Sequence, residues 1–275
     1  MRSCVCGSSF LLHTWRDNKK LDEWGTSFDD LYRRAIENLE GFQPDGLALR
    51  EAKVEGGSTF SAFGSDDYLG TRLLTPDYFS QCPLPDLIVA INPERNVLIL
   101  ADATSPAAMI QAFEDASLCA EGPGVVSLRP LVGDGKNWQE LELPEGHPAK
   151  TALHSLHVSD RVLQANTLGA ELQQLVGPQI LVEAMVGRED ENRCDTAMCW
   201  REGQPSLIAQ ADTIAFLRQD PNQPVLYASW QAVTDVAGVL MTPTSFRPQR
   251  WRLVAFPSNE QLEQMGAQPL SSAAR

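Results

Sequence analysis

The stretch Asp86-Leu-Ile-Val-Ala-Ile91 leads through the turn Asn92-Pro-Glu-Arg-Asn96 into Val97-Leu-Ile-Leu-Ala-Asp102. Two short apolar runs joined by a polar turn are typical of neighbouring antiparallel strands. Both runs are almost continuously apolar, which predicts strands in the middle of a sheet whose two faces are covered. The stretch therefore indicates a sheet protein with a buried β-hairpin at its centre.

A similar stretch occurs in the second half of the chain. Asp212-Thr-Ile-Ala-Phe-Leu217 leads through Asp220-Pro-Asn-Gln223 into Val225-Leu-Tyr-Ala-Ser-Trp230. In each half, a helical pattern follows the strand pair, beginning at Ser105 in the first and at Gln231 in the second. Another apolar strand pattern follows each helix, so the sequence predicts two like units in tandem.

The remaining periodicities define the expected units. Consecutive strands joined by short turns must be antiparallel, so we expect an α+β fold. Its two similar tandem units each have a mainly antiparallel sheet with helices packed on one face. The predicted divisions are a poorly patterned leader (1–25), a first unit (26–145), a second unit (146–270) and a frayed tail (271–275). The pattern predicts helices over 26–41, 105–118, 149–156, 158–176 and 231–241 and from 258, and strands over 46–54, 59–63, 86–92, 96–102, 125–132, 138–143, 180–186, 197–200, 213–218, 225–230 and 250–256.

Composition narrows the class of protein. The 275 residues are 43% hydrophobic and 21% charged, which fits a folded globular chain. The formal charge of −14 argues against nucleic acid and against an anionic membrane surface as partners. Six cysteines without a secretory leader, and the absence of any long apolar run, predict a reduced, cytoplasmic protein without a transmembrane helix.

No group of residues predicts catalysis or metal binding. Cys4 and Cys6 lack the further ligands that a zinc site needs. His154 and His157 have the spacing of one helical face, but no Glu-x-x-His accompanies them. Acidic residues surround Cys194, and they disfavour a thiolate. We therefore predict no catalytic residue, no cofactor and no metal site.

The candidate binding surface lies in parts of the chain that the two halves do not share. The mixed segment 64–85 and the acidic turn 189–195 are two such parts, and strand-borne tryptophans lining a groove between the units would extend the surface. Core packing is the commoner role of such tryptophans. The candidate residues are Asp66, Asp67, Tyr68, Trp138, Trp200, Glu189, Asp190 and Glu191.

Two segments resemble an uncharacterised bacterial family, the YtpQ-like proteins. They are Trp24-Gly-Thr-Ser-Phe-Asp-Asp-Leu31, followed by Ala35-Ile-Glu-Asn-Leu39, and the strand–turn–strand Pro85–Asp102. The resemblance covers about residues 24–132, without the long N-terminal extension of those proteins and with a second copy added. It implies an α+β cytoplasmic protein and supplies no catalytic residues.

These observations favour a non-catalytic cytoplasmic binding or adaptor protein of immunity or chaperone type, with a protein partner and an unknown ligand. It would bind through a groove between its two units or through an exposed sheet edge. The alternative is a small-molecule hydrolase that uses Cys or His with acidic partners, drawn from His154, His157 and Asp102. The oligomeric state stays open.

Overall fold

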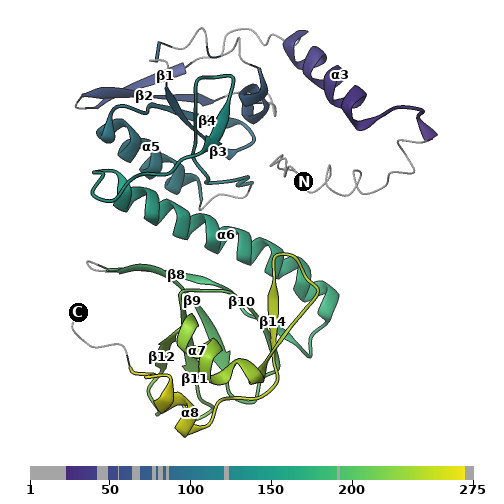
Figure 1. The fold of residues 1–275 in the computed structure, drawn as a ribbon, viewed down its shortest axis with the longest axis vertical. Coiled ribbons are helices and arrows are strands. Elements are labelled where there is room, and N and C mark those ends of the chain that lie inside the picture. The colour runs from purple at the N-terminus through teal and green to yellow at the C-terminus, as the bar shows by residue number, and fades with distance from the viewer. Residues whose placement is uncertain are drawn as a thin grey trace. The chain divides into compact units, whose positions relative to one another are not determined.

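The chain forms two compact units, Met1–His157 and Val158–Arg275. The computed structural model describes residues 23–41, 49–54, 56–63, 69–75, 79, 83–84, 87–120, 124–190 and 193–269 (Figure 1). The division lies inside one 27-residue helix, α6 (Lys150–Val176), where the sequence predicted two helices and a division at 145/146. The prediction of two helices is wrong because no proline or glycine occurs before Gly169 to interrupt the helix.

A six-stranded sheet with the order β1-β2-β4-β3-β5-β6 forms the centre of unit 1. All its neighbouring strands are antiparallel, which confirms the hairpins expected in this half. The predicted strand 125–132 is largely wrong, since Pro130 has no N–H for a ladder and β5 begins after it. The strands are β1 (Leu49–Val54), β2 (Gly57–Phe63), β3 (Ile88–Glu94), β4 (Val97–Asp102), β5 (Leu131–Gly133) and β6 (Trp138–Glu140).

The central hairpin β3–β4 is covered on both faces, as its sequence predicts. Leu98 and Leu100 pack with Phe60 and the 3₁₀ helix η1 (Leu69–Leu74) on one face. The alternate residues of β4 face the other way, where α5 (Pro106–Cys119) packs on the sheet (Figure 1). The helix α3 (Phe28–Gly41) begins where Ser27 Oγ accepts the Asp30 N–H at 3.1 Å, the expected N-cap.

Unit 2 contains two four-stranded sheets, with the orders β13-β14-β10-β7 and β12-β11-β9-β8. The pairs β10–β7 and β11–β9 are parallel, and the other pairs are antiparallel. Parallel β9 and β11 arise because an unpredicted strand, β10, lies between them in the sequence and joins the other sheet. The strands are β7 (Leu181–Val182), β8 (Val186–Asp190), β9 (Arg193–Arg201), β10 (Ser206–Ala209), β11 (Thr213–Leu217), β12 (Leu226–Ser229), β13 (Met241–Pro243) and β14 (Arg250–Leu253).

The α+β class is therefore confirmed, and one supersecondary element occurs in both units. The hairpin β3–β4 leads into α5, and the hairpin β11–β12 leads into α7 (Trp230–Ala237). Each helix has a serine N-cap: Ser105 Oγ accepts the Ala108 N–H at 3.3 Å, and Ser229 Oγ accepts the Ala232 N–H at 3.2 Å. The sheets around the two hairpins differ, so the likeness of the whole units stays a prediction. The helical elements that complete unit 2 are η2 (Gly238–Leu240) and α8 (Asn259–Gln264).

Two amide side chains attach the segment around β7 to the C-terminal part of α6. Asn166 Nδ2 donates to Met185 O at 2.9 Å, and Asn166 Oδ1 accepts the Met185 N–H at 2.8 Å. Gln173 Oε1 accepts the Val182 N–H at 2.8 Å. Polar backbone groups in this segment are thereby satisfied, and Glu183 is held between the two attachment points.

Candidate functional site

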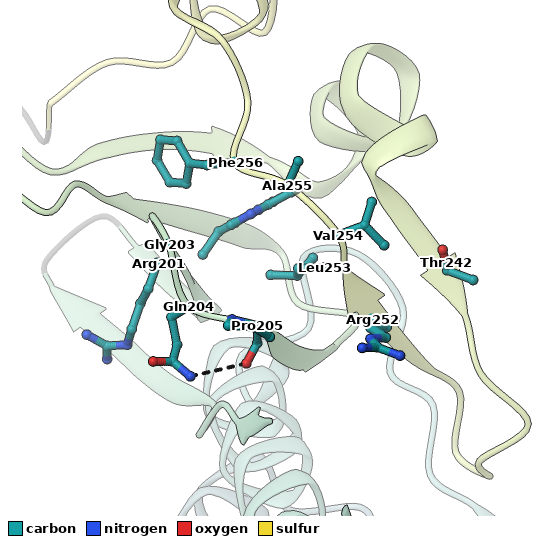
Figure 2. Close-up of a pocket in the computed structure, with 11 residues that line it drawn as sticks. Arg201, Gly203, Gln204, Pro205, Thr242, Arg252, Leu253, Val254, Ala255 and Phe256 are labelled. Atoms are coloured by element: carbon teal, nitrogen blue, oxygen red, sulfur yellow. Dashed lines mark hydrogen bonds between the residues drawn. The ribbon is translucent and has the colours of Figure 1, made fainter. Parts of the chain in front are cut away.

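A hollow of about 430 Å³ lies in unit 2, where β10 begins and β14 ends (Figure 2). Its volume is within the range of roughly 300–1,000 Å³ that is usual for ligand sites. We call this cavity the hollow. Its lining residues are Trp200, Arg201, Gly203, Gln204, Pro205, Thr242, Arg252, Leu253, Val254, Ala255 and Phe256.

The apolar part of the hollow comes from the end of β14 and the segment that follows it. Leu253 belongs to the core of unit 2, and Phe256 packs against Phe216 edge to face, with ring centroids 6.0 Å apart. Val254 is 57% exposed although its N–H donates to Leu240 O at 3.0 Å. The core thus fixes the backbone of this segment and leaves apolar surface open to solvent (Figure 2).

A tight turn between β9 and β10 supplies the polar side of the hollow. The Gln204 N–H donates to Arg201 O at 3.4 Å, which closes the turn. Gly203 has a φ of +74°, a left-handed conformation that favours glycine over residues with a Cβ. The turn therefore needs its glycine in order to place Arg201 and Gln204 beside Pro205.

Two arginines give the hollow its charge. Figure 2 shows Arg201 and Arg252 on opposite sides of Gln204 and Pro205. Arg201 Nε donates to Glu183 Oε1 at 2.9 Å. Glu183 is 4% exposed, and this burial raises the pKa of its carboxyl even though Arg201 acts in the opposite direction.

Arg252 differs from Arg201 because its guanidinium has no hydrogen-bond or ion-pair partner among the residues that the structure describes. It extends from β14 and is exposed to solvent. None of the residues that line the hollow carries a carboxylate. A cationic group thus stands beside apolar surface, which suits an anionic ligand that also has an apolar part.

The sequence around β14 is unusually basic for this acidic chain. No Asp or Glu occurs between Asp235 and Glu260, whereas Arg247, Arg250 and Arg252 all lie in that segment. This local excess of arginine is the feature of the sequence that points to the hollow. An uninterrupted absence of carboxylates in a chain of charge −14 marks a local positive region.

The structure describes only some of the candidate surface residues. Asp66, Asp67, Tyr68 and Glu191 lie outside the described residues. Glu189 and Asp190 belong to β8, where their backbones pair with Cys194 and Arg193 in the expected hairpin.

The two candidate tryptophans lie in different units. Trp138 is half-buried in unit 1, where its Nε1–H donates to Leu73 O at 2.9 Å and its ring packs edge-on against Phe79. Trp200 is among the residues that line the hollow, but it is 1% exposed in the core of unit 2, so its indole offers almost no surface to a partner. Met198 and Trp200 alternate along β9 on its core-facing side, which explains the burial.

Two of the residues considered for catalysis have structural roles, while the exposed His154 and the half-buried His157 lie three residues apart on α6. Asp102 Oδ1 accepts the Thr104 N–H at 2.7 Å, the turn expected before the α5 N-cap. His147 Nδ1 accepts the Ala149 N–H at 3.1 Å near the start of α6. Within the described ranges, no three His, Cys, Asp or Glu side chains form a group that could hold a metal ion. Cys4 and Cys6 fall outside these ranges.

The described cysteines with shifted pKa values are poor nucleophiles. Burial, followed by the nearby Glu183 carboxylate, raises the pKa of the Cys199 thiol. Burial also raises the pKa of the Cys119 thiol, with contributions from Glu94 and Asp115. A raised pKa lowers the thiolate fraction at neutral pH, and the thiolate is the attacking species.

We expect Cys199 in the folded chain to react with iodoacetamide several-fold more slowly than glutathione at about pH 7.5, because burial and Glu183 suppress its thiolate. Time-resolved mass spectrometry of the Cys199 peptide measures the rate, and the urea-unfolded chain is the control in which the difference should vanish. A folded-state rate above that of glutathione would contradict this prediction and strengthen the hydrolase alternative.

No family model, curated protein or solved structure matches this chain. None of the helices in the described parts has the length and apolar character required to cross a bilayer.

Proposed function

We propose that this chain is a non-catalytic binding or adaptor protein that holds a protein partner at the hollow in unit 2. The observation that carries the proposal is the composition of the hollow. Its lining combines Arg252, which has no partner in the described part of the chain, with the exposed Val254 and the half-buried Phe256. Protein interfaces are enriched in arginine and aromatic residues, whose charged and apolar contacts contribute strongly to binding.

A protein partner suits this geometry better than a small molecule does. The lining includes several exposed residues, so the hollow is open along its β9–β10 turn and along the segment after β14. Open apolar surface beside a charged rim is characteristic of sites that receive side chains from a partner. The hydrolase alternative gains no support from Cys119 or Cys199, because their surroundings do not favour a thiolate.

The proposal extends to the setting of the protein. A cytoplasmic location, an immunity or chaperone role and membership of the YtpQ-like family remain proposals that rest on the sequence. The acidic composition and the strand–turn–strand of residues 86–102 support them.

The proposal predicts that Val254→Glu removes a bound partner while Val239→Glu does not. Both valines are exposed, at 57% and 84%, but only Val254 lines the hollow. The wild-type chain and both variants are coupled to beads through lysine amines, which leaves the hollow free because no lysine follows Lys150. Quantitative mass spectrometry then compares the proteins that each bait retains from a lysate of the native host.

A protein retained in near-stoichiometric amount by the wild type and Val239→Glu, and reduced at least about tenfold by Val254→Glu, supports the proposal, because a charge buried against the partner costs several kcal/mol. Circular dichroism must show that both variants are folded. Equal retention on all three baits, or no stoichiometric protein on any of them, contradicts it.

A further inference from the structure

We infer that the occupant of the hollow is an acidic polypeptide segment that places an apolar or aromatic side chain against Val254 and Phe256 and a carboxylate on Arg252. This inference rests on the proposed function and specifies the partner's chemistry. Charge and surface composition are the two independent features that lead to it.

The charge of the hollow selects an anionic group. Arg252 has no partner in the described residues, and the lining offers no carboxylate of its own to neutralise it. Among the described contacts, Arg201 bonds Glu183 through Nε, and its side chain is 44% exposed, so its terminal nitrogens are accessible to a second acceptor. A carboxylate pairs readily with a guanidinium because the two planar groups can form charge-assisted hydrogen bonds.

The rest of the chain argues against a polyanion as the occupant. The protein carries a formal charge of −14, and Glu183 compensates part of the charge on Arg201. A nucleic acid needs several unpaired cations that follow its backbone, and here only Arg252 is wholly unpaired among the described residues of the lining. One or two isolated carboxylates suit this arrangement better than a row of phosphates.

The apolar surface of the hollow favours a partner that has an apolar or aromatic side chain near its carboxylate. Val254 exposes 57% of its surface, and Phe256, two residues further along the same lining segment, has its ring held by Phe216. A preformed apolar wall gains from an apolar or aromatic anchor because water leaves both surfaces. Since the hollow holds only about 430 Å³, it fits one or two side chains of a segment and not a whole folded domain.

The test uses a fluorescein-labelled peptide, Glu-Glu-Phe-Glu-Leu-Glu-Phe-Glu, with the 275-residue chain. Its matched control peptide has Gln in place of every Glu, and a single-stranded oligonucleotide of equal charge is the third probe. Fluorescence anisotropy measures Kd for the wild type, for Arg252→Gln and for Arg247→Gln. Arg247 is exposed in the same basic segment but does not line the hollow, so its variant controls for net charge.

We expect Arg252→Gln to weaken binding of the acidic peptide about tenfold, the effect of losing one charge-assisted pair, and Arg247→Gln to weaken it less than about twofold. The Gln peptide should bind the wild type about tenfold more weakly than the Glu peptide, for the same reason. Equal binding of the two peptides, equal effects of the two variants, or tighter binding of the oligonucleotide would overturn the inference. The proposed function would survive any of these results if Val254→Glu still released the native partner, so the two failures are distinguishable.

Discussion

Unit 2 is expected to lose about 3–5 kcal/mol of unfolding free energy when Trp200 is replaced by alanine. The indole is 1% exposed and packs against Phe216, with ring centroids 5.8 Å apart. Removing it leaves a large cavity among Met198, Ile214 and Phe216 that the surrounding strands cannot close. Because typical domains have total stabilities of about 5–15 kcal/mol, this single change brings unit 2 close to unfolding.

Urea denaturation followed by circular dichroism measures the loss, and Trp24→Ala is the matched control. Trp24 is 62% exposed, so the same substitution there should change the free energy of unfolding by less than about 0.5 kcal/mol. Trp200→Phe should lie between the two, because a smaller ring still fills part of the space. A loss below about 1 kcal/mol for Trp200→Ala would show that the indole is not a core residue.

The burial of Trp200 could not be predicted from the sequence alone. Alternation along β9 puts Met198 and Trp200 on one side and Cys199 on the other, and this could be deduced from the sequence. Which side faces the core depends on helices and strands from distant parts of the chain. The central hairpins were predictable because their apolar runs are continuous on both faces and leave no such choice.

The strand β10 was missed for a related reason. It has four residues, Ser206-Leu-Ile-Ala209, all of them buried, and it follows Pro205 directly. Such a short run gives no periodicity to measure, and its partners β7 and β14 lie far away in the sequence. Without β10, the parallel pairing of β9 with β11 could not be foreseen.

Predicting the hollow would also have required knowing which distant parts of the chain lie together. Its two sides, the β9–β10 turn and the end of β14, are separated by about fifty residues in the sequence. Arg250 and Arg252 share one side of β14 by alternation, yet Arg250 is fully buried and donates to Ala165 O of α6 at 2.9 Å, whereas Arg252 is exposed. Identical residues two positions apart therefore have a structural and a candidate binding role, and only the packing of α6 distinguishes them.

Asp212→Ala is expected to cost about 2 kcal/mol of unfolding free energy at neutral pH. Asp212 Oδ2 accepts both the Thr196 N–H at 2.8 Å and the Thr196 Oγ1–H at 2.7 Å, and it accepts from Arg161 Nη1 at 3.0 Å. Thr196 is fully buried while the Asp212 side chain is 42% exposed, so the variant loses a charged acceptor that water replaces only in part. Asp235→Ala is the control, since the exposed Asp235 accepts only from the neighbouring Gln231 in the described contacts, and it should cost less than about 0.5 kcal/mol.

The cost of Asp212→Ala should also depend on pH with a definite sign. Partial burial alone would raise the pKa of Asp212, but hydrogen bonds from Thr196 and Arg161 outweigh it and hold the pKa below its ordinary value. A lowered folded-state pKa means that the stabilisation is fully present above the unfolded value of about 4 and is lost as the pH falls through the folded value. Urea titrations of wild type and variant from about pH 7 to about pH 3 should therefore show a difference that is constant at first and then shrinks in acid. A difference that stays constant throughout would mean that the Asp212 charge contributes nothing, and a difference that grows in acid would reverse the assigned direction of the pKa shift.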